Sequence, residues 1–246
     1  MREKSATVDP EEIGRFAARA EAWWDPEGSF RPLHRLNPTR LAFIRQHLVT
    51  HFGRASFSLR PFEGLRLLDI GCGGGLVAEP MTRLGFTVTG IDASAEAIGV
   101  ARAHAEATGV GIDYRIGTAE TAVDTGQRFD AVLALEIIEH VADPAAFLRC
   151  LGSLVRPGGA FVGATLNRTA SSFALAVVAA EYLLGWLPRG THDWRKFMWP
   201  SELVLGLRRN GLRVTQITGV GYDLARGEWS LSQNLDVNYM VIAVRV

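Results

Sequence analysis

The chain has 246 residues, of which 48% are hydrophobic and 21% are charged. This length and balance suit a globular protein with one sizeable core and exclude a disordered chain. Its 26 Lys and Arg residues balance its 26 Asp and Glu residues. No global positive field therefore attracts a polyanion, and we expect no nucleic-acid partner. The two cysteines, Cys72 and Cys150, form no CxxC pair, which argues against a disulfide framework or a cysteine zinc site.

The N-terminal part of the chain carries two helix signals. Asp9 can cap a helix, Pro10 suits its first position, and apolar residues follow at helical spacing. We expect a loop over 25–38 and a second helix over about 39–52, which has apolar residues on one face. The two helices together would form an N-terminal helical cap over about 10–55. The first residues lack the apolar core of a secretory signal, and we expect a cytoplasmic protein.

From residue 65 the pattern changes to alternating strands and helices. The apolar segments predicted as strands are 65–71, 86–92, 111–117, 129–135, 160–166, 212–220 and 238–246. Helices are predicted at 76–84, 94–108, 143–154 and 201–210. Such βαβ alternation predicts an α/β fold with a mostly parallel sheet that helices cover.

The most specific local feature is LLDIGCGGG, residues 67–75, where the first predicted strand passes into a helix. Gly71 and Gly73 have no Cβ atom, so the backbone can approach a ligand closely. Asp92 follows at the end of the next predicted strand, where its carboxylate can accept hydrogen bonds from ribose hydroxyls. Ligands of open parallel sheets bind beyond the carboxyl ends of the strands, and the segment predicts a nucleotide-like ligand there.

Dinucleotide-dependent oxidoreductases and methyltransferases both use this geometry. The oxidoreductase fingerprint GxGxxG wants a small residue at its sixth position, where this chain has Leu76. Asp69 precedes Gly71 by two residues. A carboxylate there suits the cationic sulfonium and amino groups of S-adenosylmethionine better than a pyrophosphate. The pattern DxGxGxG therefore resembles the first motif of the class I methyltransferases, although a tight glycine turn without a ligand would also account for Gly71.

The segment after the fourth predicted strand, LALEIIEHVADP, supplies candidates for activating an acceptor. Glu136, Glu139 and His140 are spaced so that one helical turn would bring them onto one face. His140 could act as a general base that removes a phenolic proton. Alternatively, the three side chains could hold a divalent metal, Mg²⁺ or Zn²⁺, that lowers the pKa of the phenol. A third possibility is that the segment only positions the next helix.

Several blocks of the chain resemble the ubiquinone biosynthesis O-methyltransferases. These blocks are WWDPEGSFRPLHRLNPTR, LLDIGCGGGL, LEIIEHVADP, TLNRTASSFALAVVAAEYLLGWLPRGTHDWRKF and DVNYM. The WWDPEG and PRGTHDW types are more specific than the glycine motif, because general methyltransferases do not carry them. The resemblance extends over roughly 11–240.

The resemblance implies a class I, Rossmann-like methyltransferase with a seven-stranded sheet whose last strand is antiparallel, in a single domain over 1–246. The cofactor would be S-adenosylmethionine, with S-adenosylhomocysteine as product. The residues expected to contact it, from the glycine motif and from the family pattern, are Arg40, Asp69, Gly71, Gly73, Asp92 and Leu135. The EIIEH segment also matches the family's metal-associated ExxEH pattern.

The implied reaction is methyl transfer to the phenolic oxygen of 3-demethylubiquinol and of 2-polyprenyl-6-hydroxyphenol. The alternatives are a methyltransferase for another lipophilic phenol or quinone, a C-methylating quinone enzyme, a nucleotide-dependent oxidoreductase, and a non-catalytic subunit of a quinone-synthesising assembly.

Residues 169–199 interrupt the alternation of strands and helices. Within them, 173–187 is an apolar segment of 15 residues that contains Glu181, whereas a membrane span needs about 20. Tryptophans and basic residues flank it, as is typical of segments that lie at a membrane surface. We expect a lid that docks on the inner membrane and admits the polyprenylated substrate, where other ubiquinone-biosynthesis enzymes could be partners. A buried helix packed on the N-terminal pair is the alternative.

Overall fold

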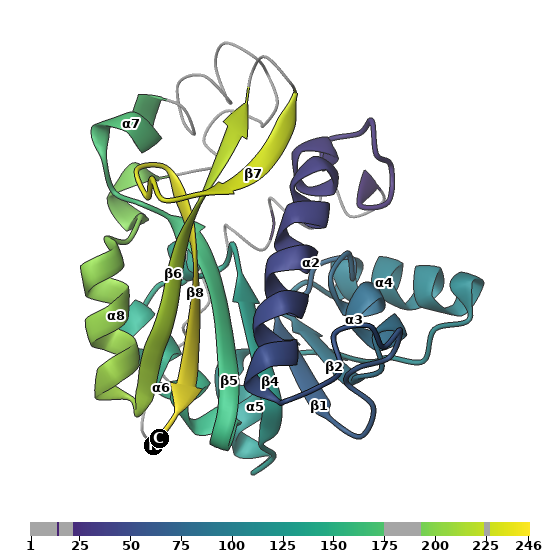
Figure 1. The fold of residues 1–246 in the computed structure, drawn as a ribbon. Helices are drawn as coiled ribbons and strands as arrows, with labels where there is room; N and C mark the ends of the chain where they lie inside the picture. The colour runs from purple at the N-terminus through teal and green to yellow at the C-terminus, as the bar shows by residue number, and fades with distance from the viewer. Residues whose placement is uncertain (1–13, 15–21, 175–192, 224–226) are drawn as a thin grey trace, which may run out of the picture.

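The computed structural model describes residues 14, 22–174, 193–223 and 227–246. They form an eight-stranded sheet with the order β3-β2-β1-β4-β5-β8-β6-β7, seen in Figure 1. The strands are β1 (Arg66–Ile70), β2 (Thr87–Asp92), β3 (Asp113–Ile116), β4 (Phe129–Leu135), β5 (Val155–Leu166), β6 (Leu212–Asp223), β7 (Glu228–Ser232) and β8 (Asn238–Arg245).

Strands β1 to β5 pair in parallel, whereas β8 lies antiparallel between β5 and β6. The predicted α/β fold, its mostly parallel sheet and its antiparallel last strand are therefore confirmed. The predicted count of seven strands is wrong, because β7 pairs antiparallel with β6 as an eighth, edge strand. Its sequence, EWSLS, is largely exposed and has no apolar run, so it lacks the hydrophobic pattern from which strands are predicted.

The helices are α2 (Arg31–His51), α3 (Ala78–Arg83), α4 (Ala95–Thr108), α5 (Ala119–Asp124), η2 (Ile138–His140), α6 (Pro144–Leu154), α7 (Ala170–Ser172), η4 (Trp194–Lys196) and α8 (Pro200–Arg209). The helix ends follow capping chemistry. Ser94 accepts a hydrogen bond from the N–H of Ala97 at the start of α4, and Gly109 ends that helix in the left-handed region. Asp143 caps α6 in the same way.

Helix α2 begins earlier than the sequence predicted. The loop expected over 25–38 is helical from Arg31 onward, with Pro32 in the first turn and Pro38 inside the helix. A proline in the first turn loses no intrahelical bond, because the N–H groups there have no helical partner. Asn37 adds a bond outside the helix, from its Nδ2 to the carbonyl of Leu76. Pro32 therefore signals the start of this helix and not a loop, whereas Pro38 lies within it.

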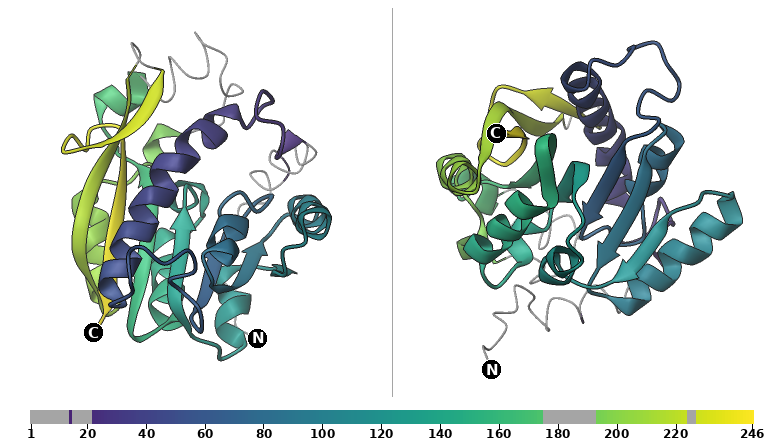
Figure 2. Two further views of the ribbon diagram at one scale, coloured as in Figure 1. Left: turned by 45° about the vertical axis from the view of Figure 1, so that its right-hand side comes forward. Right: turned by 90° about the horizontal axis from the view of Figure 1, so that it is seen from below.

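The two faces of the sheet are covered by different helices, as Figures 1 and 2 show. Helices α2, α3 and α4 pack on one face, and α5, α6 and α8 pack on the other. Successive strand residues point to opposite faces. Leu67 and Leu133 therefore join the first core, and Leu68 and Val132 join the second. The carboxyl ends of the parallel strands meet at one edge of the sheet, which positions the candidate site.

Two predictions fall on parts of the chain outside the described residues. They are most of the first predicted N-terminal helix, of which the structure describes residues 14, 22 and 23, and most of the apolar segment 173–187. None of the helices within the described ranges has the length and apolar character to cross a membrane.

Candidate active site

The loop after β1 has a backbone that only glycine adopts easily. Gly71, Gly73 and Gly75 have φ angles of 73°, 51° and 90°, and side chains rarely tolerate this left-handed region. A Cβ atom on Gly71 would lie 2.3 Å from Cδ1 of Ile137, and one on Gly73 would lie 2.5 Å from the ring of Trp23. The glycine motif therefore forms a tightly covered turn at the carboxyl end of β1.

Asp92 ties the end of β2 to this loop. Its Oδ2 accepts a hydrogen bond of 2.9 Å from the N–H of Gly73, and its Oδ1 accepts one of 2.9 Å from the N–H of Ser94. Burial raises the pKa of Asp92, and these backbone N–H groups oppose that rise. Each carboxylate oxygen has a second lone pair. The geometry leaves Asp92 able to accept further hydrogen bonds, such as those of ribose hydroxyls.

Arg40 and Asp69 are buried side chains of opposite charge that interact electrostatically, and Asp69 lies two residues before Gly71 of the loop. The two residues are 5% and 3% exposed. Burial raises the pKa of Asp69 to about 7, an effect that Arg40 opposes. Within the described parts of the chain, neither Oδ2 of Asp69 nor Nη2 of Arg40 has a hydrogen-bond partner. Leaving buried polar atoms unpaired is costly. A zwitterionic amino-acid group would satisfy both of them, so the residues present fit the methionyl part of S-adenosylmethionine.

The turn after β4 places Glu136 next to Arg40. Leu135 is buried at the end of β4, and Glu136 follows with a φ of 53°, an uncommon value for a residue with a side chain. Oε1 of Glu136 lies 3.6 Å from Nη2 of Arg40 and accepts a hydrogen bond of 3.2 Å from Nδ2 of Asn238. Sequence reasoning did not single out Asn238, although it lies in the DVNYM block.

Glu139 and His140 lie in the short helix η2, so the full helical turn expected from their spacing is absent. Oε2 of Glu139 accepts a hydrogen bond of 2.7 Å from Oγ1 of Thr165, whereas its buried Oε1 has no partner among the residues described. Burial and the neighbouring Glu136 raise the pKa of Glu139, and His140 opposes this rise. The structure thus brings a protonatable buried carboxyl close to the other two predicted residues.

The predicted metal ligands Glu136, Glu139 and His140 do not form a ready coordination set. No group of three or more His, Cys, Asp or Glu side chains in the described ranges is arranged to hold a metal ion. Metal binding by these residues stays a prediction.

Comparisons with known proteins decide the family. Residues 39–217 match the family model described as a methyltransferase domain. The chain is 56% identical over 239 residues to the ubiquinone biosynthesis O-methyltransferase of Paramagnetospirillum magneticum, covering 97% of this chain and 96% of the relative. The relative of the same name from Parvibaculum lavamentivorans is 55% identical over 240 residues, which cover 98% and 95%. The chain belongs to the ubiquinone biosynthesis O-methyltransferase family.

Solved structures agree with this methyltransferase in fold. Magnesium protoporphyrin IX methyltransferase from Synechocystis PCC 6803, with bound SAH, has a TM-score of 0.64 and 18% identity, covering 95% of this chain and 94% of that chain. A methyltransferase from Thermotoga maritima gives a TM-score of 0.63 and 17% identity, covering 96% and 99%. At such identities the likeness concerns the fold. The family and fold together set aside the oxidoreductase alternative.

Proposed function

We propose that this methyltransferase moves the methyl group of S-adenosylmethionine to a phenolic oxygen of a polyprenylated ubiquinone precursor, either 3-demethylubiquinol or 2-polyprenyl-6-hydroxyphenol. The observation that carries the proposal is the buried, incompletely bonded pair of Arg40 and Asp69 beside the glycine loop, in a chain more than half identical to O-methyltransferases of this name. Another lipophilic phenol or quinone is the second candidate acceptor.

The donor side of the proposed site comprises the glycine loop, Arg40, Asp69, Asp92 and Leu135. The guanidinium of Arg40 would bind the carboxylate of the methionyl part, and the carboxylate of Asp69 would bind its ammonium group. Asp92 would accept the ribose hydroxyls, and Gly71 and Gly73 would let the backbone approach. When bound, S-adenosylmethionine supplies the electrophilic methyl group.

The acceptor side comprises Glu136, Glu139, His140 and Asn238. The phenolic O–H must lose its proton as its oxygen bonds to the methyl carbon and the sulfur–methyl bond breaks. We infer that His140 takes this proton as the general base, with the Glu139 carboxyl as its neighbour. Binding of the acceptor oxygens by Mg²⁺ or Zn²⁺ at Glu136, Glu139 and His140 is the alternative activation. A dry site favours the reaction, because the transition state carries less separated charge than the reactants.

A membrane surface is the proposed source of the polyprenylated acceptor. Phe173 and Trp199, at the two described ends of the predicted lid insertion, are 46% and 48% exposed. The guanidinium of Arg168 lies 4.4 Å above the ring of Trp199. Exposed aromatic side chains suit a headgroup boundary. We infer that the 173–187 segment contacts the cytoplasmic face of the inner membrane, where other ubiquinone-biosynthesis enzymes could bind.

A radiolabelled methyl-transfer assay tests the proposal. Labelled S-adenosylmethionine and a short-tailed demethylubiquinol are incubated with the wild-type protein in EDTA, Mg²⁺ or Zn²⁺, and the position of the label is then determined. We expect label on the phenolic oxygen. Label on a ring carbon, or no transfer to this acceptor under any of the three conditions, would contradict the proposal.

A further inference from the structure

We propose that Trp24 is a positioning residue of the donor site, which holds the glycine loop in its binding shape through the carbonyl of Gly74. This inference rests on the proposed use of S-adenosylmethionine. It adds to the site a segment that precedes the sheet in sequence and that carries none of the predicted contact residues.

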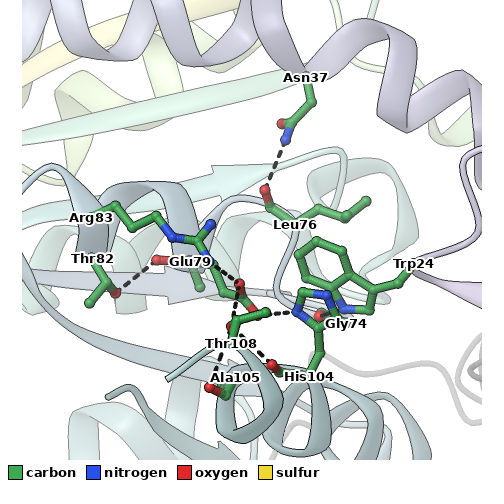
Figure 3. A network of polar contacts seen from close by, with 11 residues as sticks. Trp24, Asn37, Gly74, Leu76, Glu79, Thr82, Arg83, His104, Ala105 and Thr108 are labelled. Carbon is green, nitrogen blue, oxygen red and sulfur yellow. Dashed lines mark hydrogen bonds and ion pairs between the residues drawn. The ribbon is translucent and has the colours of Figure 1, made fainter. Parts of the chain in front are cut away.

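Trp24 is fixed on two sides, as Figure 3 shows. Its Nε1 donates a hydrogen bond of 2.9 Å to the carbonyl oxygen of Gly74. Its ring stacks on the imidazole of His104 in α4, with ring centroids 3.4 Å apart and planes 3° from parallel. The hydrogen bond therefore comes from a ring whose own position is set by α4, and it can restrain the loop.

A buried carboxylate fixes the imidazole beneath Trp24. Glu79 of α3 is fully buried. Its Oε1 lies 2.6 Å from Nδ1 of His104, and its Oε2 accepts from Oγ1 of Thr108 at 3.2 Å and from Nη2 of Arg83 at 3.3 Å (Figure 3). A carboxylate offers only lone pairs, so Nδ1 of His104 carries the hydrogen. Displacing a buried carboxylate from the donors that surround it is costly. The carboxylate of Glu79 therefore holds the imidazole in one orientation.

The neighbouring residues cover the same loop. A Cβ atom on Gly74 would lie 2.5 Å from the ring of Trp23, which stacks on Phe30 with a centroid distance of 3.8 Å. Nδ2 of Asn37 donates a hydrogen bond of 2.8 Å to the carbonyl of Leu76 (Figure 3). Two carbonyls of the loop, those of Gly74 and Leu76, are thus bonded by side chains that precede β1.

We expect the restraint of this loop to strengthen the binding of the donor. A run of glycines has wide backbone freedom, and a loop that must be ordered on binding spends part of the binding free energy on that ordering. Removing the indole N–H would loosen the loop in the free protein. The affinity for the donor would fall, whereas the chemical step of the filled site would be unchanged.

The test is calorimetric titration of S-adenosylhomocysteine into Trp24→Phe, which keeps an aromatic ring for the stack and removes the N–H. Loss of one such bond should raise Kd by about threefold to tenfold. At saturating donor, kcat and the acceptor KM should stay within about twofold of wild type. The matched control is Trp194→Phe, which removes the same kind of bond, from Nε1 to the carbonyl of Thr169 at the start of α7 and not to the glycine loop; its Kd should equal that of wild type.

His104→Phe and His104→Leu provide the second comparison. The phenyl ring keeps a flat surface under Trp24 and the leucine does not, so Kd should rise more in His104→Leu than in His104→Phe. A wild-type Kd in Trp24→Phe, or an equal rise in Trp194→Phe, would overturn the inference. So would a rise in acceptor KM as large as the rise in donor Kd. If the wild-type protein bound no S-adenosylhomocysteine at all, the proposed function would fail, which is a distinguishable result.

Discussion

On the donor side of the site, Asp92 accepts two backbone hydrogen bonds of 2.9 Å that join two strand ends. On the acceptor side, Glu139 keeps one buried oxygen unbonded among the described residues, and Glu136 has a left-handed backbone. The first arrangement depends on backbone geometry and serves one constant ligand. Both sides hold buried polar atoms that are unpaired within the described part of the chain, Oδ2 of Asp69 on the donor side and Oε1 of Glu139 on the acceptor side. Only the second side adds an uncommon backbone conformation at the end of β4, as expected where a variable acceptor and a proton must be handled.

The largest predicted effect concerns the acceptor side. His140→Ala should lower kcat roughly 100-fold to 10,000-fold, because a general base contributes on this scale, and the Kd of S-adenosylhomocysteine should be unchanged. Radiolabelled methyl transfer at saturating donor measures kcat. His51→Ala is the matched control, because His51 bonds the carbonyl of Gly158 at a site unrelated to the reaction. Full turnover of His140→Ala in the presence of EDTA would exclude both proposed modes of acceptor activation.

The next effect concerns the donor side. Gly71→Ala places a methyl group against Ile137 at a φ of 73°. Left-handed strain and the clash together should raise the Kd of S-adenosylhomocysteine roughly 30-fold or more. Gly99→Ala is the control, because a Cβ atom there has nothing within 4 Å. Calorimetry distinguishes them, and an unchanged Kd in Gly71→Ala would show that the turn does not approach the donor.

The third effect is a pH dependence of donor binding and of stability that arises from Asp69. Burial raises the pKa of Asp69 to about 7, so at lower pH this carboxyl must lose a proton before it can pair with an ammonium group. The affinity for S-adenosylhomocysteine should therefore increase about tenfold from pH 6 to pH 8. The same raised pKa means that the free protein binds the extra proton, and its stability should fall as pH rises from about 4 to 7.

Asp69→Asn provides the control for this pH dependence. The amide cannot titrate, so both slopes should flatten, although affinity at pH 8 should be lower than in wild type. Titrations at several pH values and denaturant unfolding provide the two measurements. A pH slope retained in Asp69→Asn would assign the titration to another group.

The smallest effect concerns Asn238. Asn238→Leu removes the N–H donated to Glu136, so the acceptor KM should rise about threefold, the scale of one net hydrogen bond. Donor Kd should not change. Asn210→Leu, which removes a hydrogen bond to the carbonyl of Gly206 at the end of α8, should leave both constants unchanged. An equal rise in donor Kd in Asn238→Leu would place Asn238 on the donor side.

The difference between the two sides also explains what sequence could predict. Glycines that need a positive φ, a cap such as Ser94 and apolar strands such as 129–135 are local signals, and they located the sheet, the glycine loop and Asp92. The contacts of Asn238 with Glu136 and of Trp24 with His104 join residues 102 and 80 positions apart. No local pattern encodes them, since they arise only when β8 and α4 have packed.

Where the prediction was wrong, packing outweighed local pattern. The prolines of 31–38 suggested a loop, but the segment packs as the first turns of α2. Strand β7 has no apolar run and exists because β6 offers it an edge. The first turns of α2 and strand β7 both lie outside the parallel part of the sheet, which the sequence predicted correctly.

Calorimetric titration of S-adenosylhomocysteine into wild-type protein and into Asp92→Ala tests the central claim most directly. The account predicts one molecule bound per wild-type chain and a Kd at least about tenfold weaker in Asp92→Ala, because a charged hydrogen-bond acceptor is lost. No heat of binding in the wild-type protein, or equal affinity in the two proteins, would contradict it.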